Sequence, residues 1–380
     1  MPLGNLDETL RHQLPQTFDT VGTSDPRFYD RYWFSCYDPK GEITMIIGMG
    51  LYCNMNVMDG FVACQLPNGE PGSSAGTTQH NFRFSRELRP DIDTVAVGPL
   101  SIEILDPFKR AGIKVAASDQ PLELDLEWTN FLTPKLEDHH FGRLRGRVTQ
   151  DYLRYTQVGK MAGTVTMNDK AYDLANCWGG RDHSWGVRPQ TAGPEPVTGS
   201  PQTDVMRQTG GHVFYWIPFS CEEFGGHVQV QCFGDGRQHY MDGIIQWPDG
   251  TERVVTAASF EVNFHEGTRR WKQVRSHFID EAGSTYDVVT NQLARDWAMI
   301  GTGYDWGWDD RQGLGVYRGE YYTETDTYDM SHPENVILSD GETLQPMHRE
   351  APAYGTINGM DLMGHQIVIC TGSVPFLGLD

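Results

Sequence analysis

Short runs in which apolar and polar residues alternate dominate this sequence. In residues 122–128 every second side chain is apolar, and acidic residues stand between them. Because successive side chains of a strand point to opposite faces, this pattern predicts a strand with one buried and one solvated face. Hairpin-type turns such as 67–69, 168–170 and 248–250 join several such runs. The chain is therefore predicted to be antiparallel and mostly β, with similar runs at 43–49, 82–88, 102–105, 163–174, 212–219, 227–233, 241–247, 253–264, 271–279 and 285–293.

A stretch rich in Pro and Gly interrupts this alternation near the middle of the chain. Residues 187–205 hold four prolines and two glycines and show no periodicity. This composition favours a linker or a long loop between domains. At 380 residues a single core stops growing, so two cores are expected. The sequence predicts an N-terminal β domain at 1–186 and a C-terminal β domain at 206–380, each a barrel or a sandwich.

The charge balance excludes two classes of partner. The chain has 51 acidic and 30 basic side chains and a formal net charge of −21. A nucleic-acid binder needs a basic footprint, and a protein on an anionic membrane needs a polybasic patch. Neither is visible, so no nucleic-acid partner is expected.

Cysteine usage and the N-terminus indicate where the chain is located. The seven cysteines form no CxxC pair, and an odd number at irregular spacing predicts reduced thiols. The N-terminus is polar and acidic and lacks the apolar core of a secretory signal. No segment approaches the roughly 18–20 apolar residues of a membrane span. We expect a cytoplasmic protein with no membrane span.

Motifs for common cofactors are missing or incomplete. The GxSxG match at residues 72–76 follows a Pro/Gly-rich turn and precedes a strand-like run, so it predicts a surface loop rather than a nucleophile elbow. Neither 48–50 nor 301–303 completes a GxGxxG fingerprint, and no P-loop occurs. The 13 histidines show no HExxH or zinc-finger spacing. We therefore expect neither a nucleotide cofactor nor a metal.

The densest gathering of reactive side chains is the segment 176–188, NCWGGRDHSWGVR. If it is extended, Arg181, His183 and Trp185 share one face, and Asp182 and Ser184 share the other. Histidine suits proton transfer at neutral pH, and flanking tryptophans supply a dry wall. Asp182 beside Arg181 is expected to stay ionised, which favours an orienting or base role. The alternative is a structural corner, in which Asp182 and His183 satisfy turn amides and Trp185 fills the core.

Three other segments supply further candidates. Asp151 and Tyr155 alternate onto one face of a strand at 151–157. Asp305 lies in a Gly-rich segment, 301–312, in which aromatic and charged residues are interleaved. Asn54 stands in a run of otherwise mostly apolar residues, where polar groups either pair with one another or line a pocket. The alternatives are a polar outer strand face for the first segment and two strands joined by a turn for the second.

The block from Trp178 to Gly186, with the strands before it, resembles the lipocalin-like superfamily that includes carotenoid 1,2-hydratase (hydroxyneurosporene synthase) and AttH-type proteins. More narrowly, it resembles a bacterial branch with an RDHSWG signature. The Asp-His pair followed by Trp-Gly maps to Asp182, His183, Trp185 and Gly186. The block departs from the Tyr-His-Asp-His form of the hydratases. The resemblance implies two calycin-like β domains with a ligand cavity in or between them, and chemistry on large apolar ligands: hydration, dehydration or cyclisation.

These features lead to one functional hypothesis, a cofactor-independent lyase of the hydratase or dehydratase type acting on a hydrophobic terpenoid or aromatic substrate. His183 would transfer the proton and Asp182 would hold its tautomer, as carboxylates commonly do for a catalytic imidazole. Tyr155, Arg181 and Asp151 would complete the polar end of the pocket. The predicted substrate contacts are Trp178, Trp185, Tyr215, Trp216, Asn54 and Asp305.

Two other functions stay open at this point. An isomerase or cyclase would use the same pocket without adding water, and a non-catalytic lipid or terpenoid carrier would need only the cavity. In each case the expected partner is a hydrophobic small molecule. The sequence also leaves open whether the chain forms a homodimer.

Overall fold

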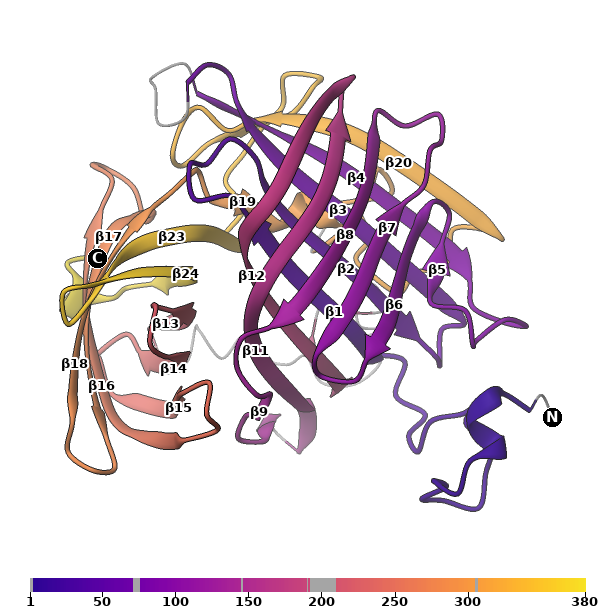
Figure 1. Ribbon diagram of the computed structural model, residues 1–380, viewed down its shortest axis with the longest axis horizontal. Helices are drawn as coiled ribbons and strands as arrows, with labels where there is room; N and C mark the ends of the chain where they lie inside the picture. The colour runs from indigo at the N-terminus through magenta and orange to yellow at the C-terminus, as the bar shows by residue number, and fades with distance from the viewer. Residues whose placement is uncertain (1–2, 71–75, 145, 190, 192–209, 305–306) are drawn as a thin grey trace.

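The computed structural model describes residues 3–70, 76–144, 146–189, 191, 210–304 and 307–380 (Figure 1). Its elements are β-strands and three short 3-10 helices, η1 (Asn5–Glu8), η2 (Met299–Thr302) and η3 (Pro375–Leu377). None of the helices in this part of the chain is long and apolar enough to cross a membrane. The predicted all-β class, with two large antiparallel sheets, is confirmed.

The first sheet has 15 strands, in the order β22-β21-β20-β4-β3-β2-β1-β12-β11-β8-β7-β6-β5, with β9 and β10 paired to β11. The long hairpin of β11 and β12 lies in its middle and carries the reactive segment. The strands are β1 (Phe28–Tyr37), β2 (Thr44–Tyr52), β3 (Val57–Pro67), β4 (Thr77–Glu87), β5 (Ala96–Val97), β6 (Leu100–Asp106), β7 (Arg110–Val115), β8 (Leu122–Asn130), β9 (Lys135–Leu136), β10 (His140–Leu144), β11 (Arg147–Met167), β12 (Lys170–Val187), β20 (Tyr321–Asp329), β21 (Val336–Ile337) and β22 (Thr343–Leu344).

The second sheet has nine strands, in the order β18-β17-β16-β15-β14-β13-β24-β23-β19. It closes on itself because β18 pairs with both β17 and β23. Closure leaves few unpaired strand edges. The strands are β13 (Gly211–Ser220), β14 (Gly225–Phe233), β15 (Gln238–Gln246), β16 (Glu252–Phe264), β17 (Trp271–Asp280), β18 (Thr285–Gln292), β19 (Trp297–Ala298), β23 (Arg349–Ile357) and β24 (Met360–Gly372).

In the described residues, alternation along the strands builds three large apolar layers, besides a small cluster around Ile300 and Tyr328. In β8, Leu122, Leu124, Leu126 and Trp128 are buried in the core of the first sheet, as the sequence predicts. A second core fills the closed sheet. A third cluster combines side chains of β1, β2 and β12 with side chains of β13, β24 and the segment 297–314. The two sheets therefore pack against each other through their own apolar layer.

The chain crosses back to the first sheet after β19. Figure 1 shows β20, drawn in orange, running beside β4. Arg83 of β4 is fully buried and pairs with two carboxylates of β20, Glu324 and Asp326, the latter at 2.8 Å. The predicted C-terminal unit, 206–380, therefore does not coincide with one sheet, because β20 pairs with β4 and β21 and β22 continue the first sheet beyond β20.

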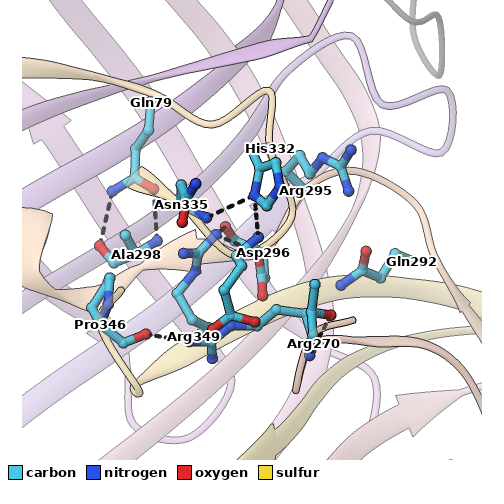
Figure 2. Close-up of polar contacts among 12 residues, drawn as sticks. Gln79, Arg270, Gln292, Arg295, Asp296, Ala298, His332, Asn335, Pro346 and Arg349 are labelled. Carbon is cyan, nitrogen blue, oxygen red and sulfur yellow. Dashed lines mark hydrogen bonds and ion pairs between the residues drawn. The ribbon is translucent and has the colours of Figure 1, made fainter. Parts of the chain in front are cut away.

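Polar contacts hold the segment at 296–298, where the chain passes from the second sheet back to the first (Figure 2). Gln79 of β4 exchanges two hydrogen bonds with the backbone of Ala298 in β19, at 2.9 and 2.8 Å. Asp296 pairs at 2.7 Å with the buried Arg349 of β23. These contacts tie the crossing segment to both sheets. Most of the predicted linker, 187–205, lies outside the described residues; Val187 ends β12, and Thr191 forms an isolated parallel bridge with Leu314.

Candidate functional site

The end of β12 presents different side chains to its two faces. Arg181 points toward the apolar core of the first sheet. Its guanidinium lies 4.9 Å from the ring centroid of Trp128 and 5.4 Å from that of Phe34. Asp182 and Ser184 point the other way, toward the second sheet, and line a cavity with Trp216. The predicted alternation of this segment is thus confirmed.

A small residue of β12, Ser184, lines this cavity, and Gly186 follows it on the same face of the strand. Because β12 lies between β1 and β11, strand register places Ser184 directly between Arg31 and Arg154. The next row of the same face places Gly186 between two tyrosines, Tyr29 and Tyr152. Long side chains therefore surround positions that have little or no side chain. The second sheet covers the gap and leaves a cavity of about 70 Å³, lined by Arg31, Trp33, Tyr152, Arg154, Asp182, Ser184, Arg188, Trp216, Tyr304, His348, Glu350 and Ile367.

Gly186 is required by the backbone at this point. Its φ is +133°, and a Cβ added there would lie 2.3 Å from the carbonyl oxygen of Asp151 and 2.6 Å from the Cα of Tyr152. Both atoms belong to the paired strand β11 and cannot move without disturbing the ladder. The Gly of the SWG sequence therefore allows β11 and β12 to approach closely beside the cavity.

Asp182 is one of the two acidic residues among the described residues that line the cavity. It is 7% exposed, and its Oδ1 is buried without a hydrogen-bond partner. Burial raises the pKa of Asp182, although the positive charges of Arg154 and Arg31 oppose the shift. The expected stabilisation of its charge by Arg181 is wrong, because alternation points these neighbours to opposite faces.

A second acid–base group faces the same cavity. His348 Nε2 lies 2.9 Å from Glu350 Oε1, and the other oxygen of Glu350 lies 3.0 Å from His365 Nε2. Burial alone would raise the pKa of Glu350, but its hydrogen bonds with both histidines hold that pKa well below its usual range. The charged Glu350 carboxylate therefore orients the imidazole ring of His348. The ring of His348 lies 5.2 Å from that of Tyr304.

The positive charge of Arg154 is balanced by Glu137, a carboxylate that does not line the cavity. Its Nη2 donates to Glu137 Oε2 at 2.7 Å, and its guanidinium lies 4.9 Å from the ring centroid of Trp216. Glu137 also lies 3.1 Å from His140 Nε2. Across the residues that the structure describes, no group of three His, Cys, Asp or Glu side chains is arranged to hold a metal ion.

His183 occupies the other face of β12 with a different partner. Its Nε2 lies 2.6 Å from Asp30 Oδ1, and its ring lies 5.3 Å from that of Tyr155 and 5.2 Å from that of Trp185. The expected pairing of His183 with Asp182 is therefore wrong, since successive residues of a strand point apart. Arg181 donates a hydrogen bond to the Tyr155 hydroxyl. Tyr155, Arg181, His183 and Trp185 thus lie together, as the sequence predicts, but with Asp30 as the carboxylate.

Two other predicted polar residues lie outside both groups. Asp151 is exposed and lies 2.7 Å from His139 Nε2. Asn54 is exposed and donates two hydrogen bonds of 2.8 Å, to the carbonyl oxygens of Thr23 and Asp25. It fastens the N-terminal segment to the β2–β3 turn instead of lining a pocket. Asp305 lies outside the described residues.

The predicted aromatic wall is divided among several places. Trp216 lines the Asp182 cavity, whereas its neighbour Tyr215 points into the closed sheet and bonds Ser276 at 2.9 Å. Trp178 stacks on Tyr37 with centroids 5.2 Å apart. It lines a separate groove of about 680 Å³ between the two sheets.

Several residues of the cavity and of the His183 group are absent from the sequence-based prediction. Arg31 and Asp30 lie in FYDRYWFSCY, where period-2 alternation gives Arg31 and Trp33 one face and Asp30 the other. That signal was available in the sequence. Tyr304, His348 and Glu350 reach the cavity only through the packing of the second sheet, which no local pattern reveals.

A model of a family of unknown function, DUF8625, matches residues 3–368. The chain belongs to this family. No curated protein matches the chain. Among solved structures, a protein of Nitrosomonas europaea provisionally named AttH (NE1406) is 12% identical with a TM-score of 0.52, over 98% of this chain and 100% of that chain. This likeness shows that the two proteins share a fold, as the expected resemblance to AttH-type proteins implies.

Two further solved structures align over most of the chain. Kievitone hydratase from Nectria haematococca is 11% identical with a TM-score of 0.41, over 98% of this chain and 96% of that one. CghA is 8% identical with a TM-score of 0.43, over 92% of this chain and 89% of that one.

Proposed function

We propose that this protein is a lyase of the hydratase or dehydratase type that works by proton transfer without a cofactor, with Asp182 at its reaction centre. The observation that carries the proposal is the buried Asp182 carboxyl, which has an unpartnered oxygen and lines a cavity between the two sheets. Buried carboxyls with raised pKa values are typical of general acids and bases.

The chemistry needs one group that removes a proton and one that supplies it. In a dehydration, a base takes the proton from the carbon next to the carbinol carbon, and the C–O bond breaks. The hydroxyl leaves as water with a proton from the acid. Asp182 and the Glu350-bound His348 face the same cavity and are suited to these two roles. Hydration is the same sequence in reverse.

The walls of the cavity support an apolar substrate. Trp33, Trp216 and Ile367 line it beside the charged groups, and each is at most 5% exposed. Such walls exclude water and strengthen the electrostatic interactions inside. We propose a terpenoid or aromatic compound, of which the reacting end enters the cavity.

The face of β12 that carries His183 is the competing location for the same chemistry. Its Asp30–His183 pair has the geometry of an oriented imidazole. We favour the Asp182 face because it is enclosed by both sheets, whereas the Asp30 side chain is 48% exposed.

The test uses ligands that co-purify with the protein, identified by mass spectrometry. Each compound is then incubated in H₂¹⁸O with the wild type and with Asp182→Asn. The proposal predicts gain or loss of water by the wild type and a rate about 10²–10⁴-fold lower in the variant. An isomerised product without ¹⁸O would indicate an isomerase or cyclase instead. A ligand recovered unchanged after long incubation with the wild type would indicate a carrier.

A further inference from the structure

The Asp182 cavity contains more free hydrogen-bond donors than acceptors. The Nε and Nη1 of Arg31 and the Nε1 atoms of Trp33 and Trp216 are buried and have no partner. These three residues are 5%, 3% and 2% exposed. Among the described residues that line the cavity, the buried acceptor without a partner is Asp182 Oδ1. Buried donors without partners destabilise a protein, so this arrangement points to a ligand that supplies acceptor atoms.

Two of the arginines that line the cavity also lack a carboxylate partner among the described residues. Arg154 is paired with Glu137, and Glu350 lies between His348 and His365. Within the described ranges, Arg31 and Arg188 take part in no ion pair within 4.0 Å. Two guanidinium groups therefore line the cavity without a carboxylate of the protein in contact.

Aromatic rings hold both of these arginines. The guanidinium carbons of Arg31 and Arg188 lie 4.8 and 5.5 Å from the ring centroid of Tyr304. Both also lie 5.6 Å from the ring centroid of Tyr29. A ring attracts a cation through its face and leaves the in-plane N–H groups free to bind something else. Both guanidinium groups thus lie against the same two rings. Arg31 keeps Nε and Nη1 without a partner, and Arg188 has the Tyr29 hydroxyl as a side-chain hydrogen-bond partner.

We infer that Arg31 and Arg188 bind an anionic oxygen group of the substrate, a carboxylate or another planar oxyanion, beside Asp182. Arginine forks match such groups with paired hydrogen bonds. The net charge of −21 repels free anions at long range, so binding would depend on these local donors. The inference rests on the proposed function in one respect only: the proposed role of Asp182 places the reacting carbon of the substrate next to the bound anion.

An oxyanion at this place has a clear chemical use. When the C–H bond next to a carboxylate breaks, its electron pair moves onto the carboxylate oxygens, and the proton passes to the enzyme base. The electron pair then returns to form the C=C bond as the C–O bond breaks, and the hydroxyl takes a proton from the enzyme acid and leaves as water. Two guanidinium groups on the oxygens would stabilise the extra negative charge in between.

The experiment measures binding of crotonate, a small unsaturated carboxylate, by isothermal titration calorimetry at low salt. Crotonamide serves as the neutral control of the same shape. The wild type is expected to bind crotonate in preference to crotonamide, and Arg31→Gln to weaken crotonate binding about tenfold or more. Arg188→Gln, at a partly exposed position, is the second variant if Arg31→Gln fails to fold by circular dichroism. Arg237→Gln, in which an arginine 74% exposed is replaced, is the matched control and should bind like the wild type.

The inference is overturned if the wild type binds no crotonate, if crotonamide binds equally well, or if the folded arginine variants bind crotonate as the wild type does. Asp182→Asn separates it from the proposed function, because removing a negative charge should preserve or strengthen crotonate binding while turnover is lost. Retained turnover in Asp182→Asn, together with weak binding in Arg31→Gln, would refute the reaction centre and leave the anion site standing.

Discussion

Gly186→Ala tests how closely β11 and β12 must approach beside the cavity. The φ of +133° lies in a region that other residues rarely adopt, at a cost of about 1–3 kcal/mol. The new methyl would lie 2.3 Å from the Asp151 carbonyl oxygen, and forcing such a contact costs about another 1–3 kcal/mol. The variant should therefore lose about 2–6 kcal/mol, a large part of the roughly 5–15 kcal/mol by which domains are stable.

The assay is urea unfolding followed by circular dichroism and tryptophan fluorescence, with Gly250→Ala as the control. Gly250 has a φ of +89° in the turn between β15 and β16, and an added Cβ there meets nothing within 4 Å. Its substitution should cost only the conformational part, roughly 1–2 kcal/mol. Equal losses in the two variants would refute the claim that backbone contact with β11 requires a glycine at position 186.

Two further predictions concern buried charges. Arg83→Met should destabilise the first sheet by about 3–5 kcal/mol in the same urea assay, because it leaves the buried Glu324 and the half-buried Asp326 without their cation; an unchanged midpoint would contradict the anchoring of β20. Asp182→Asn should change how stability depends on pH. Burial raises the pKa of Asp182 above its usual 3.8, so the wild type is most stable relative to the variant below that pH and loses this advantage as pH rises through the raised pKa. Parallel stability curves from acid to neutral pH would show that the carboxyl is not desolvated.

Local pattern was enough to predict strands such as β8 and β13–β18 and the two faces of β12, but β1, β3, β20, β23 and β24 were not predicted. Alternation in 122–128 and in 181–185 depends only on backbone geometry, and the structure reproduces both. The same rule applied to His183 and Asp182 already separates them, so the proposed pairing of these neighbours conflicted with the strand assignment. Asp30, one strand away in the register, is the partner that alternation permits.

Partners from distant parts of the chain could not be predicted in this way. Tyr304, His348 and Glu350 come to Asp182 because the second sheet packs on β1, β11 and β12, and that packing depends on long-range contacts. Asn54 shows the opposite error: a polar residue in an apolar run satisfied nearby carbonyls rather than a pocket. The composition of a sequence segment indicates whether it is buried, but it does not identify the groups that its polar side chains contact.

The most direct test compares the two faces of β12 in one experiment. Turnover of a co-purified ligand is measured for the wild type, Asp182→Asn and His183→Ala, with circular dichroism melts to show that each is folded. We predict that Asp182→Asn lowers kcat/KM about 10²–10⁴-fold and that His183→Ala changes it by less than about tenfold. The reverse order would place the reaction at the Asp30–His183 pair and contradict a reaction centre between the sheets.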